Sequence, residues 1–228
     1  ASLLSFLYPP SKDKLVSRIY IAGKIGDEIL GEDLTTCGWS DLPCKRINPG
    51  IEHRETEEQN IIQLLEGEHV SESAQISISN DITLTGKPFT DNQDENPVKR
   101  VKCVGENKAI IKVSENCKLT IESIDFMMEN GGSSGRENED DSSELQNSVI
   151  ESSEGQLELI GIKFSDIKLK NAPLLKISTS SESFIMTDGG SSSSPIRCTF
   201  EKISRSVGSG SVIDVTIRNH HIFTLSNS

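Results

Sequence analysis

A block of alternating apolar and polar residues occurs at least twice in this chain and is echoed twice more. The first copy, AIIKVSENCKLTIESIDF at residues 109–126, has an apolar pair at Ile110-Ile111, an alternating triplet at residues 119–121, and a single Phe126. The second copy, at residues 148–164, has Val149-Ile150, an alternating triplet at 157–159, and Phe164. The two copies therefore have the same three parts in the same order.

The spacing within the copies predicts how they align. Ile111 to Leu119 and Val149 to Leu157 are equal steps, as are Ile121 to Phe126 and Leu159 to Phe164, so we expect Ile111 to align with Val149. Two looser copies follow, with their apolar positions at residues 174–177, 184–186 and 200, and then at 212–215 and 222–225.

Short runs that alternate between apolar and polar residues are typical of half-buried strands. No copy can bury its apolar face alone, so the copies must stack on one another. Three short strands and three polar bends make one coil of a parallel β-helix, and stacked coils form three sheets around an apolar column. The polar inserts at 127–147 and 187–197, the second including the loop GGSSSSP at 189–195, then leave at corners. An antiparallel sandwich is the alternative, but it needs no three-part repeat and the expected Asn-Gly hairpin turns are missing.

The N-terminal quarter has a different pattern. Residues 15–22, LVSRIYIA, predict a strand, which is followed by a Gly-rich acidic loop that contains a CG…PC pair. Residues 47–65 predict a short helix covering the open end of the column, although 61–65 could already be the first strand. Residues 66–69 predict a turn, and 75–79, 82–85 and 98–105 predict further strands.

This opening, from about Arg18 to Glu58, resembles the N-terminal cap of right-handed parallel β-helix proteins of the pectin-lyase-like superfamily, most closely the repetitive surface proteins of protists. The resemblance and the repeat together predict an all-β, right-handed, three-sheet parallel β-helix with an N-terminal cap that contains a short helix. We expect residues 1–60 to form the cap and 61–228 to form coils. The last copy has no third strand or capping helix, so we expect the coils to continue beyond 228 in a longer protein.

The composition includes five cysteines. Cys37 and Cys44 are close in sequence and suit a small disulfide loop, which would indicate an oxidising compartment. A zinc half-site is the alternative, although no partner CxxC or HxxxH follows. Cys103, Cys117 and Cys198 each fall beside strand positions and are expected to be buried as small apolar side chains.

Enzymes of this family cleave acidic polysaccharides and need either Asp residues that hold Ca²⁺ beside a Lys or Arg base, or clustered carboxylates on neighbouring coils. The NTD, DD and RIK-type strings of the family do not occur on predicted strands. Asp140-Asp141 lies in the polar insert, and Arg197 faces no matching Asp string. We therefore predict no catalytic, cofactor-binding or metal-binding residues.

Four charged residues occupy outward positions on the repeating strands: Lys112, Glu151, Lys176 and Asp214. Their alternating signs predict charge pairing from coil to coil on a solvated sheet rather than a catalytic row.

Two further features are candidate binding groups. Adjacent His220-His221 would point in opposite directions, so a solvent-facing turn is a better interpretation than a metal site. Trp39 lies inside the CG…PC loop, where it is a speculative ligand platform for sugars but is better explained by packing against the cap.

A formal charge of −12 disfavours nucleic acids and anionic membranes as partners. No apolar run is long enough to span a bilayer. These observations and the family resemblance predict a non-catalytic secreted or cell-surface segment that acts as a stalk or as a recognition surface for glycans or proteins. The rival hypotheses are a polysaccharide lyase or hydrolase whose active residues lie on coils outside this segment, and an autotransporter-like passenger.

Overall fold

The computed structural model is that of a parallel β-helix. It describes residues 18–25, 28–29, 31–39, 41–52, 60–65, 67–70, 75–87, 99–103, 108–128, 144–179, 184–191, 194–208, 212–217 and 223–225.

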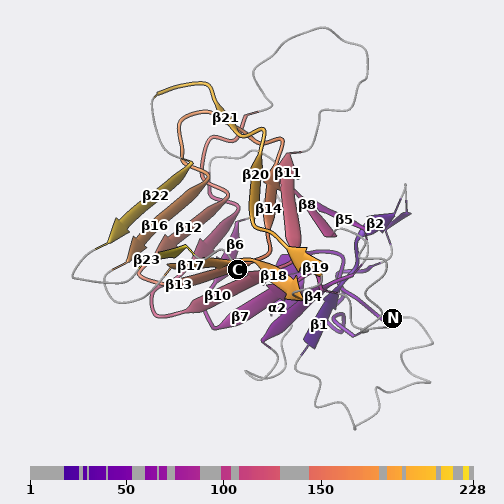
Figure 1. Cartoon of the computed structure of the whole chain (residues 1–228). Helices are drawn as coiled ribbons and strands as arrows, with labels where there is room; N and C mark the ends of the chain where they lie inside the picture. Colours follow the sequence, from indigo (N-terminus) through magenta and orange to yellow (C-terminus); the bar gives the residue numbers. More distant parts are fainter. Residues whose placement is uncertain are drawn as a thin grey trace, which may run out of the picture.

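Three sheets contain most of the strands (Figure 1). Sheet I consists of β1 (Arg18–Ile21), β4 (Ile61–Leu64), β7 (Ile82–Thr85), β10 (Lys118–Glu122), β13 (Gln156–Ile160), β17 (Phe184–Thr187) and β23 (Phe223–Leu225). Sheet II consists of β3 (Glu28–Ile29), β2 (Lys24–Ile25), β5 (Glu68–Val70), β8 (Lys99–Cys103), β11 (Ile124–Met128), β14 (Lys163–Ser165) and β20 (Thr199–Glu201). Sheet III consists of β6 (Ile76–Ile78), β9 (Ile111–Val113), β12 (Ile150–Ser153), β16 (Leu175–Thr179) and β22 (Ile213–Ile217).

The chain visits the sheets in a fixed order, as in β7, β8 and β9 and then in β10, β11 and β12. All pairings in sheets I and III are parallel, and in sheet II only β2 pairs antiparallel with its neighbours β3 and β5. Figure 1 shows each sheet as a row of arrows whose colours follow the sequence. A strand therefore pairs with its counterpart one coil away, as the repeat predicted.

The phenylalanines of the repeat form one stack inside sheet II. Phe126 aligns with Phe164, and Phe164 aligns with Phe200. The ring centroids are 5.3 Å and 5.5 Å apart, and the rings are nearly parallel. Phe126 and Phe164 are fully buried, whereas Phe200 is 37% exposed, and among the described residues no further ring stacks on it. The delayed Phe200 of the third copy was thus aligned correctly from the sequence.

The alignment in sheet III differs from the predicted one by one residue. Ile111 pairs with Ile150, not with Val149, and Ile150 pairs in turn with Leu175. Val113 pairs with Ser152 and Lys118 with Gln156, so residues 114–117 of the first copy correspond to only 153–155 of the second, and equal steps in the sequence do not mark equal positions. Val149 is nevertheless also buried, because two consecutive residues face the interior at this corner.

Three predicted irregular segments contain strands. The polar run at 189–195 forms an antiparallel hairpin of β18 (Gly189–Ser191) and β19 (Ser194–Ile196). Residues 68–69 of the predicted turn belong to β5, and residues 127–128 of the predicted insert belong to β11. At 68–69 and 189–195, hydrogen bonds to a neighbouring strand override a locally polar or Gly-rich sequence, whereas Met127 and Met128 are apolar and extend β11.

A small ladder at the corner between sheets II and III was not predicted. Here β15 (Lys168–Leu169) pairs in parallel with β21 (Ser204–Arg205) of the next coil. On its other side, Leu169 forms a parallel bridge with Leu145 of the preceding coil. Leu145, Ile167 and Leu169 are buried beneath it. The last three coils are therefore widened by a fourth short side.

The N-terminal end of the column is covered by α2 (Ile47–Glu52), which packs against β1, β4 and β6. The predicted helix at 47–65 is thus α2 followed by β4, and the alternative that 61–65 begins the first strand is confirmed. Gly50 allows the close approach of α2, because a Cβ atom there would lie 2.5 Å from Ile21 Cδ1.

His69 is a polar residue in the interior of sheet II. It aligns with Val101 and so lies two coils from Phe126 on the same inward column. One ring nitrogen, Nε2, is 3.0 Å from the carbonyl oxygen of Leu65, while Nδ1 has no hydrogen-bond partner. Burial lowers the pKa of His69, the hydrogen bond to Leu65 opposes this shift, and nearby Lys99 lowers the pKa further. The imidazole is therefore neutral at pH 7.

The stack of rings predicts a graded cost of truncation. Phe164→Ala removes the central ring from a fully buried site and should destabilise the fold by about 3–5 kcal/mol, because a cavity is left between two rings. Phe200→Ala, the matched control at the exposed end, should cost less than half as much. Denaturant unfolding followed by circular dichroism measures both free energies, and equal costs would contradict a continuous stack.

The buried histidine predicts a specific acid sensitivity. Its pKa is lower in the folded than in the unfolded state, so the stability is complete above the unfolded pKa of about 6.5 and falls as the pH drops below it. The loss is up to about 1.4 kcal/mol for each pH unit below that value, down to the folded pKa. We therefore compare the unfolding free energy at about pH 7.5 and at about pH 5.5, for the unaltered protein and for His69→Phe. The difference between the two pH values should be smaller in His69→Phe, because the other histidines contribute equally to both proteins. An unchanged difference would show that His69 does not carry the effect.

Candidate functional site: the charged outer faces and the disulfide loop

The predicted charge column lies on the outer face of sheet III. Lys112 aligns with Glu151, Glu151 with Lys176, and Lys176 with Asp214, each on adjacent strands. Lys176 Nζ is 3.1 Å from Glu151 Oε1. The Lys176 and Glu151 side chains are 53% and 32% exposed, so water screens the pair and it contributes about 0–1 kcal/mol. The predicted coil-to-coil arrangement of these four residues is confirmed.

Sheet I carries a second set of outward pairs that the sequence analysis did not identify. Lys118 Nζ is 2.8 Å from Glu158 Oε2, and the hydroxyl of Thr120 donates to the same carboxylate over 3.1 Å. The hydrogen bond from Lys118 holds the pKa of Glu158 below its usual range, against the opposing effect of partial burial. Lys87 and Thr85 contact Glu122 in the same way at 3.3 Å each.

Sheet II carries a buried carboxylate. Asp125 aligns with Lys163 and is 7% exposed. The hydroxyl of Ser165 donates to Asp125 Oδ1 over 2.8 Å. Lys163 Nζ lies 2.8 Å from Glu201 Oε2 on the next coil, so one coil bridges the carboxylates of its two neighbours.

The paired charges on sheets I and II were not predicted, because the only outward column identified from the sequence was that of Lys112, Glu151, Lys176 and Asp214, which lies on sheet III. A usable signal exists: the tripeptides Ile124-Asp125-Phe126 and Ile162-Lys163-Phe164 place opposite charges at the same position of successive copies.

The electrostatics of sheet II bear on lyase chemistry. A lyase base must be neutral near the working pH to accept a proton. The hydrogen bond to Glu201 raises the pKa of Lys163, with further contributions from Asp125 and Asp166 that outweigh desolvation. Lys163 therefore stays protonated, and its environment suits an ion pair rather than a general base.

The cap is organised by the disulfide loop, which confirms the predicted pairing of Cys37 with Cys44. Their Cα atoms are 4.9 Å apart, within the range that a disulfide requires. The loop pairs with the free edge of β1: the Tyr20 amide donates to Gly38, and the amide of Ala22 and the carbonyl of Tyr20 both bond to Cys44. The loop thus covers a strand edge that would otherwise be open.

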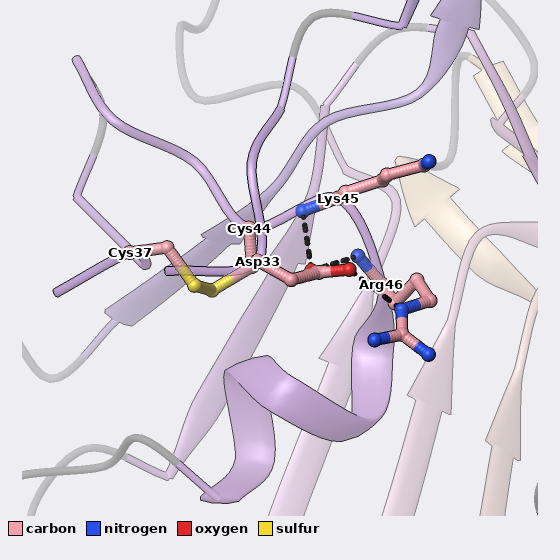
Figure 2. The surroundings of a disulfide bond; sticks show 5 residues. All are labelled: Asp33, Cys37, Cys44, Lys45 and Arg46. Carbon is pink, nitrogen blue, oxygen red and sulfur yellow. Dashed lines mark hydrogen bonds and ion pairs between the residues drawn. A yellow bond between two sulfur atoms is a disulfide. The ribbon is translucent and has the colours of Figure 1, made fainter. Parts of the chain in front are cut away.

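Asp33 fixes the start of the helix, as Figure 2 shows. One oxygen of its carboxylate accepts hydrogen bonds from the backbone amides of Lys45 and Arg46, both over 3.0 Å. The other oxygen is 2.6 Å from Arg46 Nε. These contacts tie the disulfide loop to α2, so the cap acts as one unit.

Trp39 lies at the turn of the disulfide loop, where it is half-buried and bridges to Leu42. Trp39 is thus partly accessible. The assignment of Trp39 as a platform for sugars remains a prediction.

The remaining cysteines are thiols. Cys103 and Cys117 are buried, as predicted, while Cys198 is only half-buried. Burial raises the pKa of all three, most strongly that of Cys103, so they are poor nucleophiles. The Cys198 thiol donates to the carbonyl oxygen of Thr187 over 3.0 Å.

Within the described part of the chain, no three His, Cys, Asp or Glu side chains form a group that could hold a metal ion. His220-His221 and Asp140-Asp141 lie outside the described residues. No helix among those described is long and apolar enough to cross a membrane.

The charge column of sheet III predicts a rescue experiment. Glu151→Lys places three lysines in a row and should destabilise the protein by about 1 kcal/mol at low salt, because like charges then lie on adjacent strands. Adding Lys112→Glu, Lys176→Glu and Asp214→Lys reverses every sign in the column, restores the alternation and should recover most of the loss. Urea unfolding at two salt concentrations measures this, and the loss should shrink at high salt. A quadruple variant no more stable than the single one would refute the pairing.

Comparison with known proteins returned no matching family model, no matching curated protein and no matching solved structure. What the structure shows is the architecture of a β-solenoid, in which the strands of successive coils stack in parallel.

Proposed function

We propose that this chain is a non-catalytic, secreted or cell-surface β-helix segment that acts as a structural stalk or as a recognition surface for glycans or proteins. The observation that carries the proposal is the pairing of outward charges between coils on all three sheets. Lys176 with Glu151, Lys118 with Glu158, and Lys163 with Glu201 each join adjacent coils. Charges engaged in this way brace neighbouring coils against one another.

The protonation states of these groups support the same conclusion. A general acid needs a carboxyl group whose pKa is raised, and a general base needs an amine whose pKa is lowered. Glu158 and Lys163 are shifted in the opposite directions by their ion-pair partners. Both groups are therefore charged at neutral pH and suited to electrostatic contacts rather than to proton transfer.

The secreted or cell-surface location is supported by the cap. Disulfides persist in oxidising compartments and are rare in the cytosol. The Cys37–Cys44 bond lies in the loop that covers the edge of β1, where it holds a structural element in place. The remaining thiols have raised pKa values, which does not suit redox chemistry.

Regular stacking also suits a stalk. Adjacent strands in a sheet are about 4.8 Å apart, so each coil adds that length along the axis, and every coil is hydrogen-bonded to the next in several sheets. Such a rod holds its two ends at a fixed separation. Its flanks present side chains at fixed intervals, which is the geometry that a repeating glycan or an extended protein surface would match.

One assay separates this proposal from a lyase. The protein is incubated with polygalacturonate and Ca²⁺, and unsaturated products are followed by their ultraviolet absorbance, with a reducing-end assay for hydrolysis. We expect no turnover above a heat-denatured control. Turnover abolished by Lys163→Ala or Asp125→Asn would overturn the proposal and would locate an active site on sheet II.

A glycan array then tests recognition. A saturable hit that is lost in Trp39→Ala, with circular dichroism unchanged, would place binding at the disulfide loop. A hit that persists in Trp39→Ala would place it on the flanks. Absence of any hit would leave the stalk role and remove glycan recognition from the proposal.

A further inference from the structure

A short chain of hydrogen bonds joins the buried His69 to the cap, which here means the described residues from β1 to α2. His69 Nε2 is 3.0 Å from the carbonyl oxygen of Leu65, and the Leu65 amide donates to the carbonyl oxygen of Ile21 over 2.8 Å. Ile21, the last residue of β1, forms a parallel bridge with Cys44 of the disulfide loop. Leu65 thus connects an imidazole in the first coil, which consists of β4, β5 and β6, to the strand on which the cap is built.

The boundary between the cap and the first coil is weakest in sheet II, where His69 lies. In sheet I, β1 and β4 align through four residues. In sheet II, β5 aligns with β8 of the next coil through three residues, but its pairing with β2 of the cap consists of Lys24 and Glu68 alone. Segments held by few hydrogen bonds open before the rest of a protein unfolds. Local separation of the cap therefore begins beside His69.

We propose that protonation of His69 opens the cap: at mildly acidic pH the cap separates locally and reversibly from the first coil, while the stacked coils stay folded. The carbonyl of Leu65 can only accept, so Nε2 carries the proton of the neutral ring and Nδ1 is bare. A proton on Nδ1 would create a charged N–H that has no acceptor among the described residues, in a side chain that is 4% exposed. That cost is relieved when opening admits water.

The charged groups around His69 act in the same direction. Lys99, on the inward side of β8, is 6% exposed, and its charge adds to the effect of burial in lowering the pKa of His69, while the hydrogen bond to Leu65 opposes both. Cys103 is the other titratable group on that side of β8, and burial raises its pKa, so it stays neutral. The remaining charged positions of these strands, Lys24, Glu68, Arg100 and Lys102, are next to inward residues and so belong to the opposite face.

The direction of the pH effect follows from these shifts. The pKa of His69 is lowered in the closed protein and returns to about 6.5 when water surrounds the ring. The open form therefore binds the additional proton, so opening increases as the pH falls through about 6.5 and is unaffected well above it. The inference concerns the cap, so it holds whether or not the flanks bind glycans.

The disulfide reports on the opening because it is enclosed in the cap. Cys37 and Cys44 are 4% and 0% exposed, so a reductant reaches the sulfur atoms only after the cap has opened. The test treats the whole chain with a water-soluble phosphine, which cleaves the S–S bond to two thiols and is itself oxidised to the phosphine oxide with oxygen from water. The rate is followed by alkylation and mass spectrometry and divided by the rate for urea-unfolded protein at the same pH. It should rise up to about tenfold between about pH 7.5 and about pH 5.5.

Two variants assign the effect to His69. His69→Gln keeps a hydrogen-bond donor but does not titrate, so its normalised rate should be the same at both pH values. Asp33→Asn is the matched control within the cap, because it removes the charge from the contacts with Lys45 and Arg46. It should raise the rate at both pH values and leave their ratio unchanged.

Hydrogen exchange of the unaltered protein separates local opening from global unfolding, even if His69→Gln fails to fold. After correction for intrinsic rates, the amides of β1 and the disulfide loop should lose protection at about pH 5.5, while those of β10 and β13 keep it. Equal loss of protection in the cap and the coils would overturn the inference. A normalised reduction rate that does not change with pH, or an acceleration that persists in His69→Gln, would overturn it as well.

Discussion

The structure depends on one constraint: each coil must present its apolar residues at the same positions as the coil beneath it. A single coil is too thin to bury its own interior, so the burial of Phe164 is provided by Phe126 on one side and Phe200 on the other. The same holds in sheet III, where Ile111, Ile150 and Leu175 align. These contacts are between residues far apart in sequence, and they form only when the bends between strands have the correct length.

The same constraint makes the two ends of the column special. At the N-terminal end, α2 covers the interior and the disulfide loop pairs with the free edge of β1. Asp33 joins these two devices through its hydrogen bonds to the backbone at Lys45 and Arg46. At the other end, among the described residues, Phe200 and Val212 remain exposed. Open edges of sheets are templates for further pairing, and the cap removes that edge at the N-terminal end.

Alignment of the interior also aligns the exterior. Because successive side chains on a strand point to opposite faces, fixing the apolar columns fixes the outward residues as columns too. The signs of the charges at aligned positions then determine whether adjacent coils attract or repel one another. On this chain they alternate on sheet III and are bridged on sheets I and II. Ion pairs of this kind are individually weak, so the apolar columns and the strand hydrogen bonds hold the coils together.

Much of this arrangement was determined by the sequence alone. The repeated three-part block determined the parallel β-helix, the stack from Phe126 to Phe200, and the outward column from Lys112 to Asp214. These inferences succeeded because alternation along a strand reports directly which side chains face inward.

Other features were decided only by the tertiary structure. The pairing of Ile111 with Ile150 instead of Val149 depends on the relative lengths of two bends, and both candidate partners are apolar. The burial of His69 and Asp125, the β18–β19 hairpin and the ladder of β15 with β21 arise from contacts with other coils. The local sequence pattern shows which side chains of a strand face inward. Which strand lies next to it, and in which register, is set by long-range hydrogen bonding and packing.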